Sequence, residues 1–347
     1  MAPMRQRTGG VGRIAAGALT AAVLLLSPAA ARAAAGEAVL ETLKVHSPAL
    51  AGNLEGNSPL RDVIVVLPPS YGTDTQRRYP VVYFLHGYFA SSRQLDGLVK
   101  YQALVTAAAA RGHEFILVAP DSYTRFAGAM YSNSITTGDF EGFISRDLVA
   151  WVDGRYRTLA RPAGRGLAGH SMGGYGALKI AMKYPGIFSS VYALSPCCLS
   201  PRTTTPEQAQ RLAAMPIEDA MKAPFAQRAA FAQAVAWSPN PRNPPYYADF
   251  GVKGGKLDPV TLGAWAANAP LAMLPQYVGA LKGLTAIGLE VGDKDALLRD
   301  DTAMHEALGK FGIPHDWAVY DGDHGNRLAE RMRDYMLPFF ARHLAKR

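Results

Sequence analysis

Cysteine is scarce in this sequence: its 347 residues include only two, Cys197 and Cys198, and these are neighbours. A disulfide between adjacent cysteines strains the peptide that links them. We therefore expect two small buried thiols at a strand end, with a strained vicinal disulfide as the alternative. The sequence also has no Cys-x-x-Cys pair and no cluster of histidines and cysteines, which excludes the usual spacings of zinc ligands. No metal site is expected.

Charged residues are few as well, at 18% of the chain against 49% hydrophobic residues, which is a globular composition. The formal net charge of +8 overstates the charge of the folded part. Four arginines and no acidic residue fall within the first 33 residues, and without them the net charge is +4. A basic run, or a basic stripe with interleaved aromatic residues, is also lacking. The composition therefore indicates no nucleic-acid partner.

The amino-terminal 35 residues have the pattern of a cleavable secretory signal peptide. Three arginines between Arg5 and Arg13 precede an apolar stretch at 14–26, and small residues at 31–35 fit a cleavage site. The alternative is a membrane anchor, but the apolar stretch is shorter than the ~20 residues of a membrane span. We therefore expect a secreted or periplasmic protein with no stable membrane insertion after the signal is removed.

Beyond residue 35, short apolar runs alternate with amphipathic stretches. The strand-like runs are 63–67, 81–85, 115–119, 166–169, 190–194, 286–291 and 317–320, and the helix-like stretches are 94–110, 140–156, 174–184, 302–311 and 328–344. Continuous apolar runs of this length are typical of strands buried on both faces, and their alternation with helices indicates βαβ units. The pattern predicts one α/β domain over 36–347, with a mostly parallel, doubly wound sheet.

Residues 199–284 interrupt this alternation with a long stretch rich in alanine, proline and aromatic residues. Four prolines between Pro239 and Pro245 predict an irregular loop there. Long insertions in a compact domain are usually functional, so we interpret 199–284 as a lid or binding wall, with Trp237 as a candidate substrate contact. The alternative is that the insertion only covers the sheet edge and the core.

The segment Gly169-His170-Ser171-Met172-Gly173 is a G-x-S-x-G motif between a strand-like and a helix-like run. This context predicts a nucleophile elbow, a sharp turn that projects the Ser171 hydroxyl from the carboxyl edge of the sheet in an α/β-hydrolase fold. A serine needs a base to hold its proton. We expect Ser171 to be the nucleophile.

The base and the acid should follow the serine in the chain order Ser, Asp or Glu, His. His324 follows the last strand-like run and is the predicted base, whereas His170 should point away from Ser171 because side chains alternate along a strand. Asp295 and Asp293 both follow the run 286–291 and are therefore the candidates for the acid. Asp295 is preferred and Asp293 is the alternative. Asp300 and Asp301 are expected to cap and charge the next helix.

The transition state of acyl transfer also needs donors for its oxyanion. One is the N–H of Met172, which follows the nucleophile, and the other should come from the loop after an early strand. Tyr88, in Leu85-His86-Gly87-Tyr88, is the preferred donor and Phe89 the second candidate. We expect His86 to shape this loop.

These segments, together with Gly174-Tyr175-Gly176-Ala177 and Tyr184-Pro185-Gly186-Ile187-Phe188, resemble the esterase D family. That family includes S-formylglutathione hydrolases, feruloyl, acetyl-xylan and tributyrin esterases, and mycolyltransferases. The resemblance covers about 61–344 and implies an α/β-hydrolase fold with a triad on Ser171, Asp295 and His324. It also makes Tyr131 and Asn133 candidate substrate contacts, and Phe89, in the loop after the early strand, is a further candidate. The insertion at 199–284 is longer than in a minimal member.

Taken together, the residues predict an exported serine carboxylic-ester hydrolase that forms an acyl-enzyme and needs no cofactor. Its substrate would be a small-molecule, lipid or carbohydrate ester. An acyltransferase of the mycolyltransferase type, with a sugar or glycerol hydroxyl as acceptor, is the first alternative. A non-catalytic binding descendant of the fold is the second.

Overall fold

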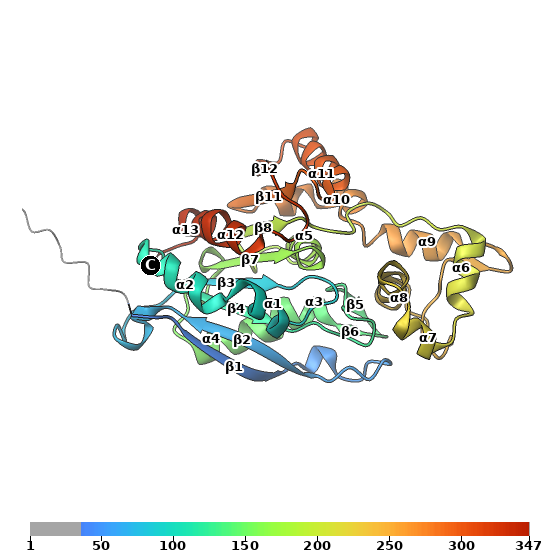
Figure 1. Cartoon of the computed structure of the whole chain (residues 1–347), viewed down its shortest axis with the longest axis horizontal. Helices are drawn as coiled ribbons and strands as arrows, with labels where there is room; N and C mark the ends of the chain where they lie inside the picture. Colours follow the sequence, from blue (N-terminus) through green and yellow to red (C-terminus); the bar gives the residue numbers. More distant parts are fainter. Residues whose placement is uncertain (1–35, 347) are drawn as a thin grey trace, which may run out of the picture. The chain divides into compact units, whose positions relative to one another are not determined.

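An eight-stranded sheet forms the centre of the computed structural model, which describes residues 36–346 (Figure 1). Its strands, in the order in which they lie side by side, are β1 (Val39–His46), β2 (Leu60–Leu67), β4 (Ile116–Pro120), β3 (Val81–Leu85), β7 (Arg165–His170), β8 (Ser190–Leu194), β11 (Ala286–Gly292) and β12 (Asp316–Tyr320). The pairs β1–β2 and β2–β4 are antiparallel, and the remaining neighbours are parallel. The predicted mostly parallel sheet is thereby confirmed. The predicted signal peptide lies outside the described residues.

The strands are buried on both faces because their apolar side chains alternate between two hydrophobic clusters. In β2, Val63 and Val65 belong to one cluster and Ile64 and Val66 to the other. The first cluster continues into α4 (Leu148–Arg155) and the insertion, and the second into the helical segments at 92–110 and 328–343. The sheet is therefore covered on both faces.

The edge strand β1 was not predicted from the sequence. Only Val45 is buried in it, and its other side chains are exposed or half-buried, including the charged Glu41 and Lys44. Such a strand lacks the continuous apolar run that marks the central strands. It forms because each of its eight residues pairs with β2, from Val39 opposite Leu67 to His46 opposite Leu60.

The predicted helix over 94–110 is two helices, α1 (Ser92–Val99) and α2 (Tyr101–Ala110). Lys100 separates them in a left-handed conformation, with φ 59°. The Asp96 side chain stabilises this break because it accepts a hydrogen bond of 2.9 Å from the first N–H of α2. The apolar periodicity continues across this break, so the sequence predicts one helix instead of two.

The other predicted helices form, two of them with a π-helical turn inside. Their bounds are α3 (Phe140–Gly142) joined to α4 by the turn Phe143–Asp147, α5 (Met172–Lys183), α11 (Leu298–Lys310), and α12 (Leu328–Arg331) joined to α13 (Leu337–His343) by the turn Met332–Met336. No helix in 36–346 is long and apolar enough to cross a membrane.

The insertion is largely helical. It contains α6 (Pro206–Ala213), α7 (Ile217–Lys222), α8 (Phe225–Trp237), the short pair β9 (Val252–Lys253) and β10 (Lys256–Leu257), α9 (Pro259–Ala266) and α10 (Pro270–Lys282). Three of these helices begin with proline, whose missing N–H and fixed φ suit the first helical position. The proline-rich segment 239–245 is irregular, as predicted. Helices α6 to α9, yellow to orange in Figure 1, lie together at one end of the sheet.

A buried ion pair anchors α12 to the sheet. Arg331 donates from Nε and Nη2 to the two carboxylate oxygens of Glu290 on β11, at 3.0 and 2.7 Å, and the Tyr192 hydroxyl of β8 donates to the same carboxylate. Glu290 is fully buried and Arg331 nearly so. A buried charge of this kind is stable only while it is paired.

We expect Arg331→Met to lower the free energy of unfolding by about 3–5 kcal/mol, because it leaves Glu290 charged, buried and unpaired. Urea denaturation followed by circular dichroism measures the loss. The matched control is Arg333→Met, which removes an exposed arginine paired with Asp334 and should cost at most about 1 kcal/mol. Equal losses in the two variants would contradict the anchoring role.

Candidate active site

Ser171 occupies the tight turn between β7 and α5 with φ 56° and ψ −117°. This strained backbone costs about 1–3 kcal/mol and is the conformation expected of a nucleophile elbow. Gly173 is required here, because a Cβ on it would lie 1.9 Å from the Leu85 carbonyl oxygen. The turn is held from outside the helix by the Ser171 N–H, which donates to the Leu194 carbonyl at 2.9 Å.

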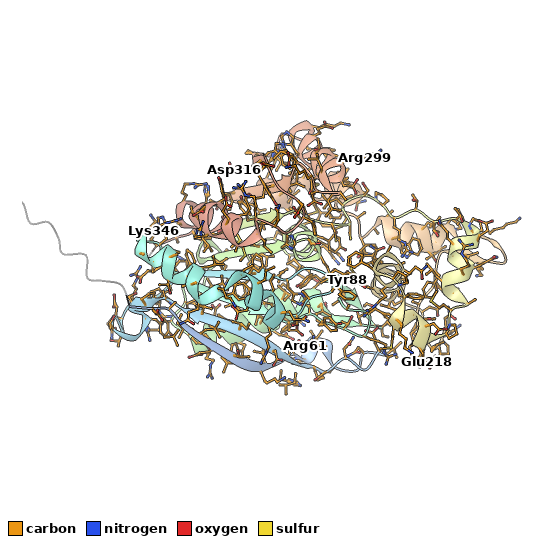
Figure 2. The ribbon with its side chains drawn as sticks, viewed as in Figure 1. Arg61, Tyr88, Glu218, Arg299, Asp316 and Lys346 are labelled. Atoms are coloured by element: carbon orange, nitrogen blue, oxygen red, sulfur yellow. The ribbon has the colours of Figure 1, made fainter. Side chains whose placement is uncertain are left out.

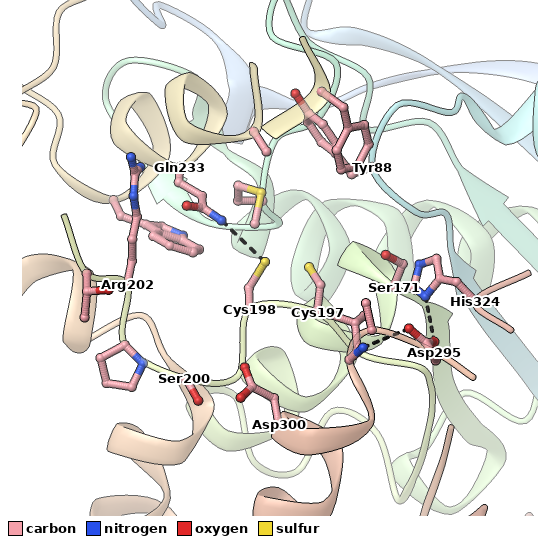
Figure 3. A pocket seen from close by; sticks show the side chains of 18 of the residues that line it. Tyr88, Ser171, Cys197, Cys198, Ser200, Arg202, Gln233, Asp295, Asp300 and His324 are labelled. Atoms are coloured by element: carbon pink, nitrogen blue, oxygen red, sulfur yellow. Dashed lines mark hydrogen bonds and ion pairs between the residues drawn. The ribbon is translucent and has the colours of Figure 1, made fainter. Parts of the chain in front are cut away.

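His324 and Asp295 follow β12 and β11 and meet at the carboxyl edge of the sheet, beside Ser171 (Figure 3). His324 Nδ1 lies 2.8 Å from Asp295 Oδ2. The Leu297 N–H donates to the other Asp295 oxygen at 2.9 Å. Burial alone would raise the pKa of the Asp295 carboxyl, but these hydrogen bonds outweigh it and lower the pKa. Asp295 is therefore charged at neutral pH and holds the imidazole with its Nδ1–H toward the carboxylate.

Within the described residues, the alternative acid, Asp293, makes no hydrogen bond or ion pair with the imidazole. Its carboxylate accepts a hydrogen bond of 2.9 Å from the Gly322 N–H, in the loop that carries His324. His170 contacts the same loop, because its Nε2 lies 2.7 Å from the His324 carbonyl oxygen. Burial and the neighbouring His324 lower the pKa of His170 to about 4, so its ring is neutral and donates to that carbonyl. Asp293 and His170 thus fix the backbone of the loop.

The candidate oxyanion donors differ in whether their N–H groups are already hydrogen-bonded. The Phe89 N–H is engaged, because it donates to the Ala127 carbonyl at 3.0 Å. Within the described residues, the N–H groups of Tyr88 and Met172 donate to no other protein group. His86 is buried and shapes the loop before Tyr88: its Nε2 accepts from the Ser122 N–H at 2.7 Å, and its Nδ1 donates to the Gly87 carbonyl at 2.9 Å. Burial lowers the pKa of His86, so its ring is neutral.

A cavity of about 770 Å³ opens beside these residues. Ser171, Asp295 and His324 line it together with Tyr88, which lies where the insertion approaches the sheet (Figure 2). The opposite wall comes from the insertion. Its lining residues from α8 are Phe225, Ala229, Gln233 and Trp237. In 36–346, no group of three or more His, Cys, Asp and Glu side chains is placed to hold a metal ion.

The sequence matches the model of the family described as "Putative esterase" over residues 59–327, which is more than half of the chain. The chain belongs to this esterase family. It is 38% identical over 132 residues to Esterase Rv1288 of Mycobacterium tuberculosis, and 27% identical over 155 residues to S-formylglutathione hydrolase of Bos taurus. These stretches are 37% and 39% of this chain and 27% and 51% of the two relatives. The chain thus spans less than two thirds of the length of either.

Three solved structures share the fold. They are a ferulic acid esterase (TM-score 0.64, 20% identity, 89% of this chain and 98% of that one), an S-formylglutathione hydrolase from Staphylococcus aureus (0.59, 16%, 88% and 100%) and MPT51 of Mycobacterium tuberculosis (0.56, 15%, 88% and 99%). At such identities the likeness concerns the fold alone. It confirms the predicted α/β-hydrolase fold.

The candidate substrate contacts from the sequence fall into two groups. Trp237 lines the cavity, as expected for a contact. Tyr131 does not: it is fully buried against Gly176, and its hydroxyl donates to the His86 carbonyl at 3.0 Å. Asn133 is exposed on the short strand β5 (Asn133–Ser134), and Phe89 packs outside the cavity against Phe225. These last three are not among the residues that line the cavity, and their role as substrate contacts stays a prediction.

Several other residues that line the esterase's cavity were not identified as site residues from the sequence. Cys197 and Cys198 are free thiols, half-buried rather than buried, and both face the cavity beyond the end of β8. Arg202 and Gln233 reach it from the insertion. For the cysteines a usable signal was their position at the carboxyl end of a parallel strand, where sites of α/β sheets gather. The insertion residues carry no comparable signal.

A buried polar network fixes the insertion wall to the esterase's core. Trp237 Nε1 donates to Ser132 Oγ at 3.1 Å, and Lys179 Nζ on α5 donates to the same oxygen at 2.6 Å. Lys179 also lies 3.0 Å from Glu141 Oε1 and 2.6 Å from Asn268 Oδ1. Burial lowers the pKa of Lys179 to about 8, which leaves it mostly protonated at neutral pH and paired with Glu141.

Asp301 lies in the first turn of α11, as expected, but its carboxyl is fully buried and both oxygens lack a hydrogen-bond partner within the described chain. Burial, with a contribution from the nearby Asp295 and Asp300 carboxylates, raises the pKa of Asp301 to about 9. Asp301 is therefore neutral at pH 7 in the folded esterase, and it does not serve as the charged first-turn residue that the sequence predicts.

We expect Asp301→Asn to stabilise the protein by roughly 1–4 kcal/mol at pH 7 and by almost nothing at pH 4. The unfolded aspartate ionises above pH 4 while the folded one does not, so the wild type loses stability as the pH rises, and asparagine removes that loss. Urea denaturation at pH 4, 5.5 and 7 measures the difference. Asp300→Asn, whose carboxyl faces the cavity, is the control. A gain independent of pH would rule out this account.

Proposed function

We propose that this chain hydrolyses carboxylic esters through a covalent acyl-enzyme on Ser171. The observation that carries the proposal is the convergence of a strained serine and an Asp295–His324 pair, bonded at 2.8 Å, on the wall of one cavity. Membership of the esterase family supports the reaction class. The names of its relatives, esterase and S-formylglutathione hydrolase, agree with acyl transfer to water.

In the proposed mechanism, Ser171 Oγ attacks the ester carbonyl while His324 Nε2 takes its proton. The Nδ1–H of His324 donates to Asp295, whose negative charge stabilises the imidazolium that forms. The N–H groups of Met172 and Tyr88 bind the oxyanion, since neither has another acceptor in the described chain. His324 then protonates the leaving alcohol, and a water molecule, deprotonated by His324, releases the acid.

We expect Ser171→Ala and Asp295→Asn each to lower kcat for p-nitrophenyl butyrate by roughly 10⁴-fold or more, because the first removes the nucleophile and the second leaves the imidazole in the wrong tautomer. Initial rates at pH 7.5 measure both losses. Unchanged circular dichroism and thermal midpoints would show that the variants remain folded.

Asp293→Asn is the matched control for the acid, because Asp293 contacts the loop backbone and not the imidazole. It should keep most of the activity. Full turnover by Ser171→Ala would exclude the proposed mechanism, and a larger loss in Asp293→Asn than in Asp295→Asn would reassign the acid.

We further propose that the esterase is exported and that residues 1–35 are removed as a signal peptide. The arginines, the apolar stretch 14–26 and the small residues at 31–35 support this proposal. Expression of the full chain in a bacterial host should yield an extracytoplasmic protein that begins near residue 34 or 36. Intact mass and amino-terminal sequencing check the cleavage. A full-length protein confined to the cytoplasm would refute export.

A further inference from the structure

The cavity has a polar end remote from the serine. Figure 3 shows Arg202 and Gln233 on one side of the cavity and Ser171 and His324 on the other, with the cysteine pair between them. Arg202 comes from the segment after β8, and Gln233 from α8. The guanidinium of Arg202 is the positively charged group at this end of the cavity.

Two contacts hold this guanidinium in place. Arg202 Nη1 donates to the Ala230 carbonyl on α8 at 2.8 Å. The Arg202 Cζ lies 4.4 Å from the centroid of the Trp265 ring, and Trp265 is itself fully buried and donates from Nε1 to Ser238 Oγ at 2.8 Å. A planar cation fixed on an aromatic face is preorganised to bind a planar anion.

Arg202 has no counter-ion among residues 36–346, although it is half-buried. Its one hydrogen bond uses a single N–H of the five that a guanidinium carries. Burial lowers the pKa of Arg202 to about 10, which still leaves it charged at neutral pH. The other cation at the cavity, Lys294, is already paired with Asp321. A desolvated charge without a partner is unfavourable, so a bound anion would relieve this cost.

The cavity lining is mainly apolar, with Met130 and Trp237 among its residues, and the Asp300 carboxylate also faces it. The two thiols lie between Ser171 and Arg202 (Figure 3). An apolar stretch bounded by a reactive serine at one end and a fixed cation at the other matches an amphipathic substrate. Its scissile ester and its anionic group would be separated by a hydrophobic body.

We propose that Arg202 is a specificity-determining residue that binds a carboxylate carried by the ester substrate, remote from the scissile carbonyl. The inference rests on the proposed function. The carboxylate can belong either to the acyl part or to the alcohol part of the ester, and the experiment distinguishes these two sources.

The test compares kcat/KM for two sets of anionic probes and their neutral matches in wild type, Arg202→Met and Arg202→Gln. Mono-4-nitrophenyl esters of glutarate, adipate and suberate carry the carboxylate on the acyl part. The butyrate ester of 3-(4-hydroxyphenyl)propanoate carries it on the alcohol part, with the butyrate of its methyl ester as its neutral match. The 4-nitrophenyl esters of pentanoate, hexanoate and octanoate are the neutral matches for the first set.

We expect the anionic-to-neutral ratio of kcat/KM to fall roughly 10- to 100-fold in both variants for one of the two probe sets, mainly through KM, because a charge-assisted hydrogen bond is lost. The set that responds identifies the part of the substrate that Arg202 contacts. Arg211→Met is the matched control: it removes an exposed arginine of α6, outside the cavity, and should leave both ratios unchanged.

An unchanged ratio for both probe sets, in folded variants that still hydrolyse esters, would overturn the role of Arg202 and leave the proposed function intact. A wild type that hydrolyses none of the probes would overturn the two together. Arg202→Gln guards against a folding defect, because its amide can still donate to the Ala230 carbonyl.

Discussion

The left-handed backbone at Ser171 is the constraint on which the candidate site depends. A non-glycine residue in this region is unfavourable, so the surrounding sheet has to hold it. The Ser171 N–H donates to Leu194 in β8, and its carbonyl accepts from the Cys197 N–H at 3.1 Å, beyond the end of the same strand. Gly173 lets the start of α5 approach the end of β3 within contact distance. The position of the hydroxyl is therefore set by three neighbouring strands together with its own helix, in which the Tyr175 N–H donates to the Ser171 carbonyl at 3.0 Å.

Two loops then have to meet this hydroxyl, and the loop that carries His324 is held at its backbone as well as at its side chain. Asp295 orients the His324 ring, while His170 binds the carbonyl of the same histidine and Asp293 binds the Gly322 N–H. Two aspartates separated by a single residue thus have distinct roles. One fixes the imidazole, and the other fixes the chain that carries it. Such support from surrounding groups keeps a site close to its productive geometry.

Much of this arrangement could be predicted from the sequence, because buried parallel strands carry continuous apolar runs and their carboxyl ends share one edge of the sheet. That reasoning placed Ser171, Asp295 and His324 at one edge, and the structure brings them together. It preferred Asp295 but kept Asp293 as an alternative, since both follow β11 and a pattern does not give the direction of a side chain. Tyr131 faces the core instead of the cavity for the same reason.

The sequence predicted the insertion as a possible wall, but not most of the residues that line the cavity, because these depend on long-range packing of the insertion. Trp237 donates to Ser132, which also accepts from Lys179, so residues far apart in sequence meet in a buried network that includes Glu141. A buried ion pair adds little net stability, but breaking it is costly, so this network favours one arrangement of α8 over others. Lys179 belongs to α5, the helix that begins beside Ser171. The wall that would select a substrate is thus fixed to the same helix as the serine, and a group bound at the far wall is held at a defined distance from the hydroxyl.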